Sequence, residues 1–216
     1  RAGDTAEADR IFAEAETLAR AQPATAIGAA LRHVASAFAE LRRTNESLRL
    51  LKDIPEKSDH VPVLITAVTQ EALAGNIATA HALAGTLSET HHRVGVLGPV
   101  AVAQRRAGNR RAAEATLADA FAATDRITYP FAKAYALSRI ALALAEIADE
   151  EKDAAARMAA FEGAAALAEQ IGDDSLRAQT LWTIAAAVDR GGNADQARAI
   201  EARAERATRE IKSRLD

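Results

Sequence analysis

One short phrase recurs along the chain: a Gly-Asn or Gly-Asp step, followed by an alanine-rich stretch typical of a helix. The phrase begins at Gly3, Gly75, Gly108 and Gly192. An alanine stands five residues after each glycine, and the residue seven positions further on is again small or apolar. Small residues at these positions let a neighbouring helix approach closely. A recurring unit of helix, tight turn and helix predicts a stacked helical array, and such arrays mostly bind other molecules.

The composition favours a helical core with few aromatic side chains. Aromatic residues make up 4% of the 216 residues, whereas hydrophobic residues make up 49%. Alanine, leucine, isoleucine and valine must therefore fill the interior, and alanine is also the strongest helix former. The net charge is −3, with both signs interspersed. This balance argues against nucleic acid as the main partner.

The sequence lacks the usual signs of chemistry. It contains no cysteine, which excludes disulfides, zinc–thiolate sites and cysteine nucleophiles. No apolar run approaches the roughly 18 residues of a membrane-spanning helix, and no phosphate-binding or zinc-protease motif is present. His91 and His92 follow Glu89, but adjacent side chains on a helix point about 100° apart. We therefore expect a protein that is not an enzyme, with no catalytic residues, no metal and no cofactor.

The first residues suggest that the chain is part of a longer protein. It begins at Arg1 without an initiator methionine, and Gly3 occupies the position of a turn between two helices. This start predicts upstream sequence, in which an export signal would not be seen. The compartment is left open between the cytoplasm and the periplasm.

The spacing of the glycines leads to a family resemblance. Gly75 and Gly108 are 33 residues apart, close to the repeat of about 34 residues in tetratricopeptide (TPR) proteins. The segment containing Gly3, Ala8 and Phe12 matches the second-helix pattern of that family best, whereas segment 45–54 carries no alanine pattern. The chain resembles the TPR family in architecture. The resemblance implies an all-α fold, a right-handed superhelix (α-solenoid) of antiparallel helix pairs.

We expect one helical-repeat domain over residues 1–216. A lone helix at 4–21 precedes five helix pairs, and the last helix, 193–214, forms a polar C-terminal cap. The predicted pairs are 25–42 with 45–54, 60–73 with 76–89, 93–107 with 109–124, 130–149 with 152–170, and 175–190 with 193–214. Pro99 lies inside one of these helices, which predicts that this helix starts late or is kinked.

The resemblance also implies a binding surface, because the first helices of successive TPR pairs line a concave groove. The predicted groove is small-sided and apolar, and its residues are Ile65, Thr69, Leu73, Val102, Tyr135, Ser138, Leu142 and Trp182. We expect it to hold a partner protein or an apolar peptide, as an interaction scaffold. The alternative is a carrier for a lipid- or sterol-like small molecule in a cell-envelope transport pathway. A third reading is that longer helices close the array and make these residues part of the core.

A basic cluster brackets the Gly108 turn. It consists of Arg105, Arg106, Arg110 and Arg111. Arginines at a helix C-terminus are favoured by the helix dipole, so a purely structural role is one reading. The other reading is an anion contact for an acidic partner or a lipid headgroup, since arginines in the first turn of the next helix gain nothing from the dipole.

Overall fold

The computed structural model describes residues 2–213 of the chain, and the side chains of residues 6–211. This part of the chain is built from helices and contains no strand, so the predicted all-α class is confirmed. The helices form two compact units, with the boundary between Leu87 and Ser88. The single repeat domain and the right-handed superhelix stay predictions. None of the helices in the described residues is long and apolar enough to cross a membrane.

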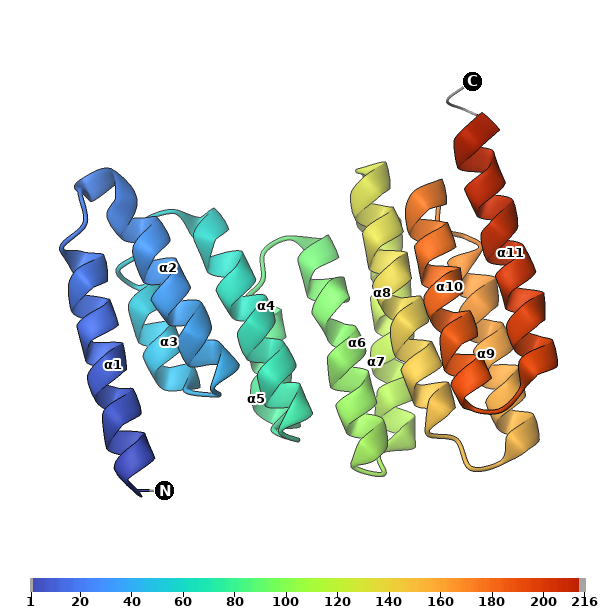
Figure 1. Ribbon diagram of the computed structural model, residues 1–216, viewed down its shortest axis with the longest axis horizontal. Coiled ribbons are helices and arrows are strands. Elements are labelled where there is room, and N and C mark those ends of the chain that lie inside the picture. The colour runs from blue at the N-terminus through green and yellow to red at the C-terminus, as the bar shows by residue number, and fades with distance from the viewer. Residues whose placement is uncertain (1, 214–216) are drawn as a thin grey trace. The chain divides into compact units, whose positions relative to one another are not determined.

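Unit 1 contains five helices (Figure 1). They are α1 (Ala2–Arg20), α2 (Ala24–Glu40), α3 (Thr44–Leu51), α4 (Lys57–Leu73) and α5 (Ile77–Gly85). In this unit α2 packs against α1, α3 and α4, while α5 packs against α4. The Phe12 ring on α1 stacks on Phe38 of α2 with 4.1 Å between ring centroids. This stacked pair joins α1 to α2 through two aromatic side chains, although the composition of the chain is low in aromatic residues.

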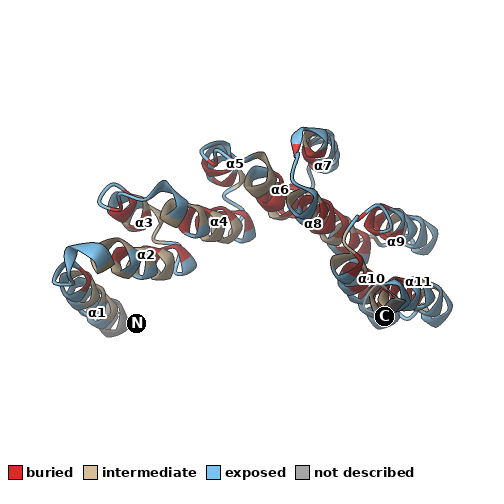
Figure 2. Ribbon diagram, turned by 90° about the horizontal axis from the view of Figure 1, so that it is seen from above, coloured by how far each residue is buried: buried red, intermediate tan, exposed pale blue. Residues whose placement is uncertain are grey.

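Unit 2 contains six α-helices and one short 3-10 helix. They are α6 (Thr90–Arg106), α7 (Arg110–Ala123), η1 (Thr124–Arg126), α8 (Pro130–Asp149), α9 (Ala154–Ala168), α10 (Asp174–Arg190) and α11 (Ala194–Ser213). The first helices α6, α8 and α10 lie side by side, and α7, α9 and α11 each pack against the helix before them (Figure 2). Every predicted helix is present in the two units, with ends within four residues of the expected ones.

Three of the four glycine turns form as predicted. Gly75, Gly108 and Gly192 have φ angles of 80°, 81° and 82°, the left-handed conformation that glycine adopts without steric cost. The N–H of the next residue donates back to the helix at each turn, as Asn76 does to the Glu71 carbonyl at 2.9 Å. The glycine therefore ends each helix and reverses the chain.

A fourth turn of this kind occurs where the sequence has no glycine. Arg42 has a φ of 59°, and the N–H of Arg43 donates to the Phe38 carbonyl at 2.8 Å. Arg42 precedes Gly75 by 33 residues, and Gly75 precedes Gly108 by 33 residues. The α2–α3 pair thus has the same type of turn as the next two pairs, although its sequence has no glycine at this position.

The turn predicted at Gly3 is wrong, since Gly3 lies inside α1. Such a turn needs a preceding helix whose carbonyls accept the N–H groups of the glycine and its successor. Gly3 has a helical backbone instead, so the chain does not reverse there.

Of the two alternatives expected around Pro99, the late start of the helix is wrong, and the kink stays a prediction. Helix α6 begins at Thr90 and runs through Pro99 to Arg106. A Cβ atom on Gly98 would come within 3.0 Å of the Ala143 Cβ atom, and one on Gly95 within 3.3 Å of the Tyr135 ring. The two glycines therefore bring α6 close to α8 and do not interrupt α6.

Candidate functional site

Helices α8 and α10, which pack against each other, both present apolar side chains to the surface. On α8 these are Phe131, Tyr135 and Leu142, whose spacing of four and seven residues places them on one helical face. On α10 the exposed aromatic side chain is Trp182. Phe131, Tyr135 and Trp182 are 68%, 38% and 42% exposed, and Leu142 is half-buried. We call these four residues the α8–α10 face.

The helices that bear this face are held together beneath it. The hydroxyls of Ser138 on α8 and Thr180 on α10 are hydrogen-bonded at 2.7 Å, and both residues are buried. Leu137, Ile140 and Leu181 are also buried below the surface. The two helices that carry the exposed aromatic rings are therefore packed against each other through buried side chains.

The predicted groove residues fall into two groups. Five of them lie in unit 2, where Tyr135, Leu142 and Trp182 belong to the α8–α10 face. The other two, Val102 and Ser138, are buried, with 2% and 3% of their surface exposed. Both pack inside unit 2, as the closed reading of the array expects for these positions.

The three groove residues of unit 1 lie on α4. Ile65 and Thr69 are half-buried, and the Thr69 hydroxyl donates to the Ile65 carbonyl at 2.8 Å. Leu73 is 60% exposed. Thr69 is thus satisfied within its own helix, and Leu73 is the accessible apolar group of the three.

The basic cluster is largely paired with carboxylates of the same unit. Arg105 lies 3.0 Å from Glu151, and Arg110 lies 2.8 Å from Glu114. Arg106 contacts two glutamates, Glu146 at 2.8 Å and Glu150 at 2.5 Å. Arg111 is exposed. An external anion at the predicted contact would have to compete with these carboxylates.

An apolar pocket with a charged rim lies between α7, α8 and α9. Leu117, Leu144 and Ile147 contribute to its walls, and the pairs of Arg105 and Arg110 with their glutamates lie among its lining residues. Its volume is about 190 Å³. Pockets for drug-sized ligands occupy roughly 300–1,000 Å³, so this pocket is small for a lipid or a sterol.

The two adjacent histidines lie at the start of α6. Their ring centroids are 3.9 Å apart, and burial lowers the pKa of His92, with a further contribution from His91. Among the described residues, no group of three or more His, Asp and Glu side chains is arranged to hold a metal ion.

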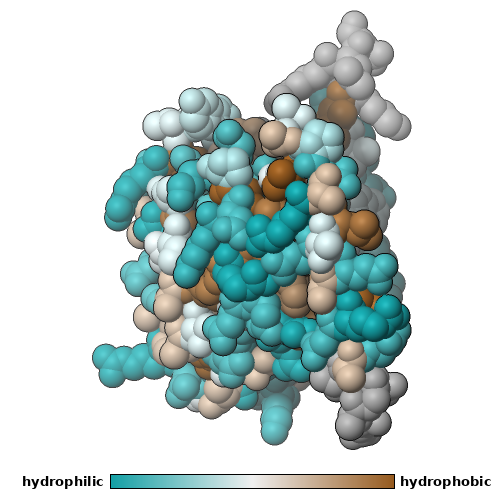
Figure 3. Space-filling view, turned by 90° about the vertical axis from the view of Figure 1, so that its left-hand side faces the viewer, coloured by the Kyte–Doolittle hydropathy of each residue, from teal (hydrophilic) through white to brown (hydrophobic). Residues whose placement is uncertain are grey.

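Exposed apolar residues also occur at the end of unit 1. Ile11 and Leu18 are seven residues apart on α1 and are 53% and 59% exposed. Figure 3, which looks at this end of unit 1, shows hydrophobic areas broken up by hydrophilic side chains. The α8–α10 face differs because it concentrates aromatic rings.

Sequence reasoning missed several residues that the structure brings to the surface of unit 2. Phe131 was not among the groove residues, although its spacing from Tyr135 and Leu142 would have placed it there. Arg157 and Met158 on α9 carry no sequence signal, because their pocket forms only when the α10–α11 turn packs beside them.

Comparison with known proteins adds no assignment. No protein-family model matches the chain, and no curated protein or solved structure shows a significant similarity to it.

Proposed function

We propose that this chain is a non-catalytic interaction module in which the α8–α10 face binds an apolar segment of a partner protein. The observation that carries the proposal is the exposure of Trp182, Tyr135 and Phe131 on two neighbouring helices, α8 and α10. Clustered exposed apolar side chains commonly mark interaction sites. Tryptophan and tyrosine are enriched among the residues that dominate binding energy.

The repeat arrangement supports the same proposal. Turns at Arg42, Gly75 and Gly108 recur every 33 residues with the same backbone conformation. We propose that the helix pairs stack as a TPR-like superhelix, an architecture that offers extended binding surfaces. For the lipid-carrier alternative, the apolar α7–α9 pocket is small, with a volume of about 190 Å³.

The experiment compares protein capture by three forms of the full chain. Wild-type protein, Trp182→Ala and Phe121→Ala are used as baits in extract from the native host, and bound proteins are quantified by mass spectrometry. Phe121 is the matched control, since it is an aromatic residue on α7 with 43% exposure. We expect a partner that is lost with Trp182→Ala and retained with Phe121→Ala.

Two results would contradict the proposal. Partners retained equally by all three baits would show that the α8–α10 face does not bind them. A lipid-sized mass released on denaturing the purified wild-type protein, with no partner captured, would favour the carrier instead.

A further inference from the structure

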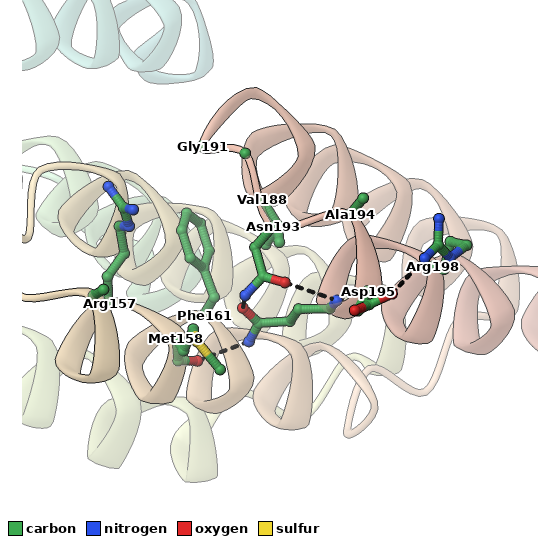
Figure 4. Close-up of a pocket in the computed structure, with 12 residues that line it drawn as sticks. Arg157, Met158, Phe161, Val188, Gly191, Asn193, Ala194, Asp195 and Arg198 are labelled. Carbon is green, nitrogen blue, oxygen red and sulfur yellow. Dashed lines mark hydrogen bonds and ion pairs between the residues drawn. The ribbon is translucent and has the colours of Figure 1, made fainter.

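A second pocket in unit 2 has the size of a small-molecule site. It lies between the first half of α9 and the turn that joins α10 to α11 (Figure 4). Its volume is about 530 Å³, within the roughly 300–1,000 Å³ that such sites usually occupy. We call it the α9–α11 pocket. Its residues lie on α9, at the end of α10, in the α10–α11 turn and at the start of α11. None of them belongs to the α8–α10 face.

One part of this pocket is apolar. Met158 on α9 is 47% exposed, whereas Phe161 and Val188 are buried with 2% and 1% exposed. Figure 4 shows the Phe161 ring between Arg157 and the α10–α11 turn. Phe161 and Val188 are therefore packed into the protein, while Met158 is the accessible apolar side chain, and methionine adapts to ligands of irregular shape.

Most polar side chains of the pocket are already satisfied. The Gln196 amide donates to the Met158 carbonyl at 2.8 Å, and its backbone N–H donates to the Asn193 side-chain oxygen at 3.1 Å. Arg198 is paired with Asp195. These bonds fix the entry to α11 and leave its polar groups with little capacity for a ligand.

Arg157 is different. It is half-buried and lines the pocket, yet within residues 6–211 its guanidinium has no hydrogen-bond or ion-pair partner. The lining contains two arginines and one aspartate, and that aspartate is engaged by Arg198. Among the charged residues that line the pocket, Arg157 is therefore the one without an ion-pair partner, and it lies beside an apolar surface. A guanidinium matches a carboxylate with two parallel hydrogen bonds.

We propose that the α9–α11 pocket binds a small apolar carboxylate. The carboxylate pairs with Arg157, and the apolar part of the ligand lies against Met158 and Phe161. A monoanion fits because a single cationic charge is available. This site is separate from the α8–α10 face, so the two proposals stand or fall independently.

The chain has one methionine, which gives the test a local signal. Protein labelled with ¹³C at the methionine methyl group shows a single NMR resonance for Met158. Three probes are titrated into the full chain: decanoate, decanol as the uncharged chain, and acetate as the charge alone. We expect decanoate to shift the resonance saturably and to bind at least tenfold more tightly than either of the other probes.

Two variants connect the signal to the arginine. Arg157→Gln should bind decanoate about tenfold more weakly, because a charge-assisted hydrogen bond is lost. The Arg157 guanidinium has no partner in the described structure, so the variant should remain folded, as checked by circular dichroism. Arg126→Gln is the matched control, an exposed arginine of η1 that does not line the pocket, and should bind like the wild type. Equal affinity for decanol, full affinity in Arg157→Gln, or an unmoved Met158 resonance would each overturn the proposal.

Discussion

Arg42 and Gly75 occupy the same position of two successive turns, and both have a left-handed backbone, with φ angles of 59° and 80°. A side chain in this conformation brings Cβ close to the following carbonyl oxygen, which costs roughly 1–2 kcal/mol. The α2–α3 turn therefore retains backbone strain that the glycine turns avoid.

Replacing Arg42 with glycine should stabilise unit 1. Relief of the strain exceeds the extra conformational entropy that glycine gives to the unfolded chain, and the expected net gain is about 0.5–1 kcal/mol. Hydrogen exchange of the α2 and α3 amides measures the local free energy of opening. Gly75→Ala is the reciprocal variant and should be destabilising. Faster exchange in Arg42→Gly than in the wild type would contradict the prediction.

Glu16 should make unit 1 sensitive to acid. Its hydrogen bond with Arg49, followed by that with Arg20, lowers the pKa of this carboxyl to about 2 from 4.5. The depressed pKa means that the contribution of Glu16 is complete above pH 4.5 and is lost as the pH falls towards 2. Both arginines are partly exposed, so we expect about 1 kcal/mol.

The variant Glu16→Gln tests this pH dependence. It should be less stable than the wild type at pH 7, and the difference should vanish near pH 2, as measured by hydrogen exchange of α1 and α3. Glu40→Gln, which replaces an exposed glutamate of the same unit, is the control. A difference that persists unchanged at pH 2 would show that the Glu16 charge is not the cause.

Gly98 and Gly163 should respond oppositely to alanine. A Cβ atom on Gly98 would meet the Ala143 side chain at 3.0 Å and the Arg139 carbonyl oxygen at 3.3 Å. Gly98→Ala should therefore push α6 from α8 and cost about 1–3 kcal/mol. Gly163 lies in α9 with nothing within 4 Å of a Cβ atom, so Gly163→Ala should stabilise by about 0.5–1 kcal/mol. Urea unfolding of both variants measures the changes, and equal effects would show that the α6–α8 approach is not tight.

Replacing both Trp182 and Leu142 with alanine should weaken partner capture and preserve helicity. Trp182 is 42% exposed, so more than half of this large side chain is packed, and its loss should cost about 1–3 kcal/mol. Leu142 packs partly against the core of unit 2 and should cost about 1 kcal/mol more. Circular dichroism checks the fold before capture is measured. An unfolded double variant would place both residues in the core and remove them from the binding surface.

The sequence by itself determined the helices and the glycine turns. Hydrophobic periodicity and the left-handed preference of glycine act within a few residues, so the turns at Gly75, Gly108 and Gly192 could be predicted. The Arg42 turn could not, because arginine carries no such preference and the conformation is imposed by the packing of α2 against α3 and α4. Gly3 shows the converse, because this glycine was expected at a turn and lies inside α1.

The tertiary structure decided which residues are available to bind. The sequence pattern assigned Val102 and Ser138 to the same groove as Tyr135 and Leu142. In the structure, neighbouring helices cover Val102 and Ser138. Arg105 and Arg106 find glutamates more than 40 residues away in the chain, and Arg157 lies beside a pocket whose other wall is the α10–α11 turn. Burial and ion pairing depend on distances between helices, which a local sequence pattern does not specify. The physical reason is that a helix follows from local backbone preference, whereas a surface is what remains exposed after all helices have packed.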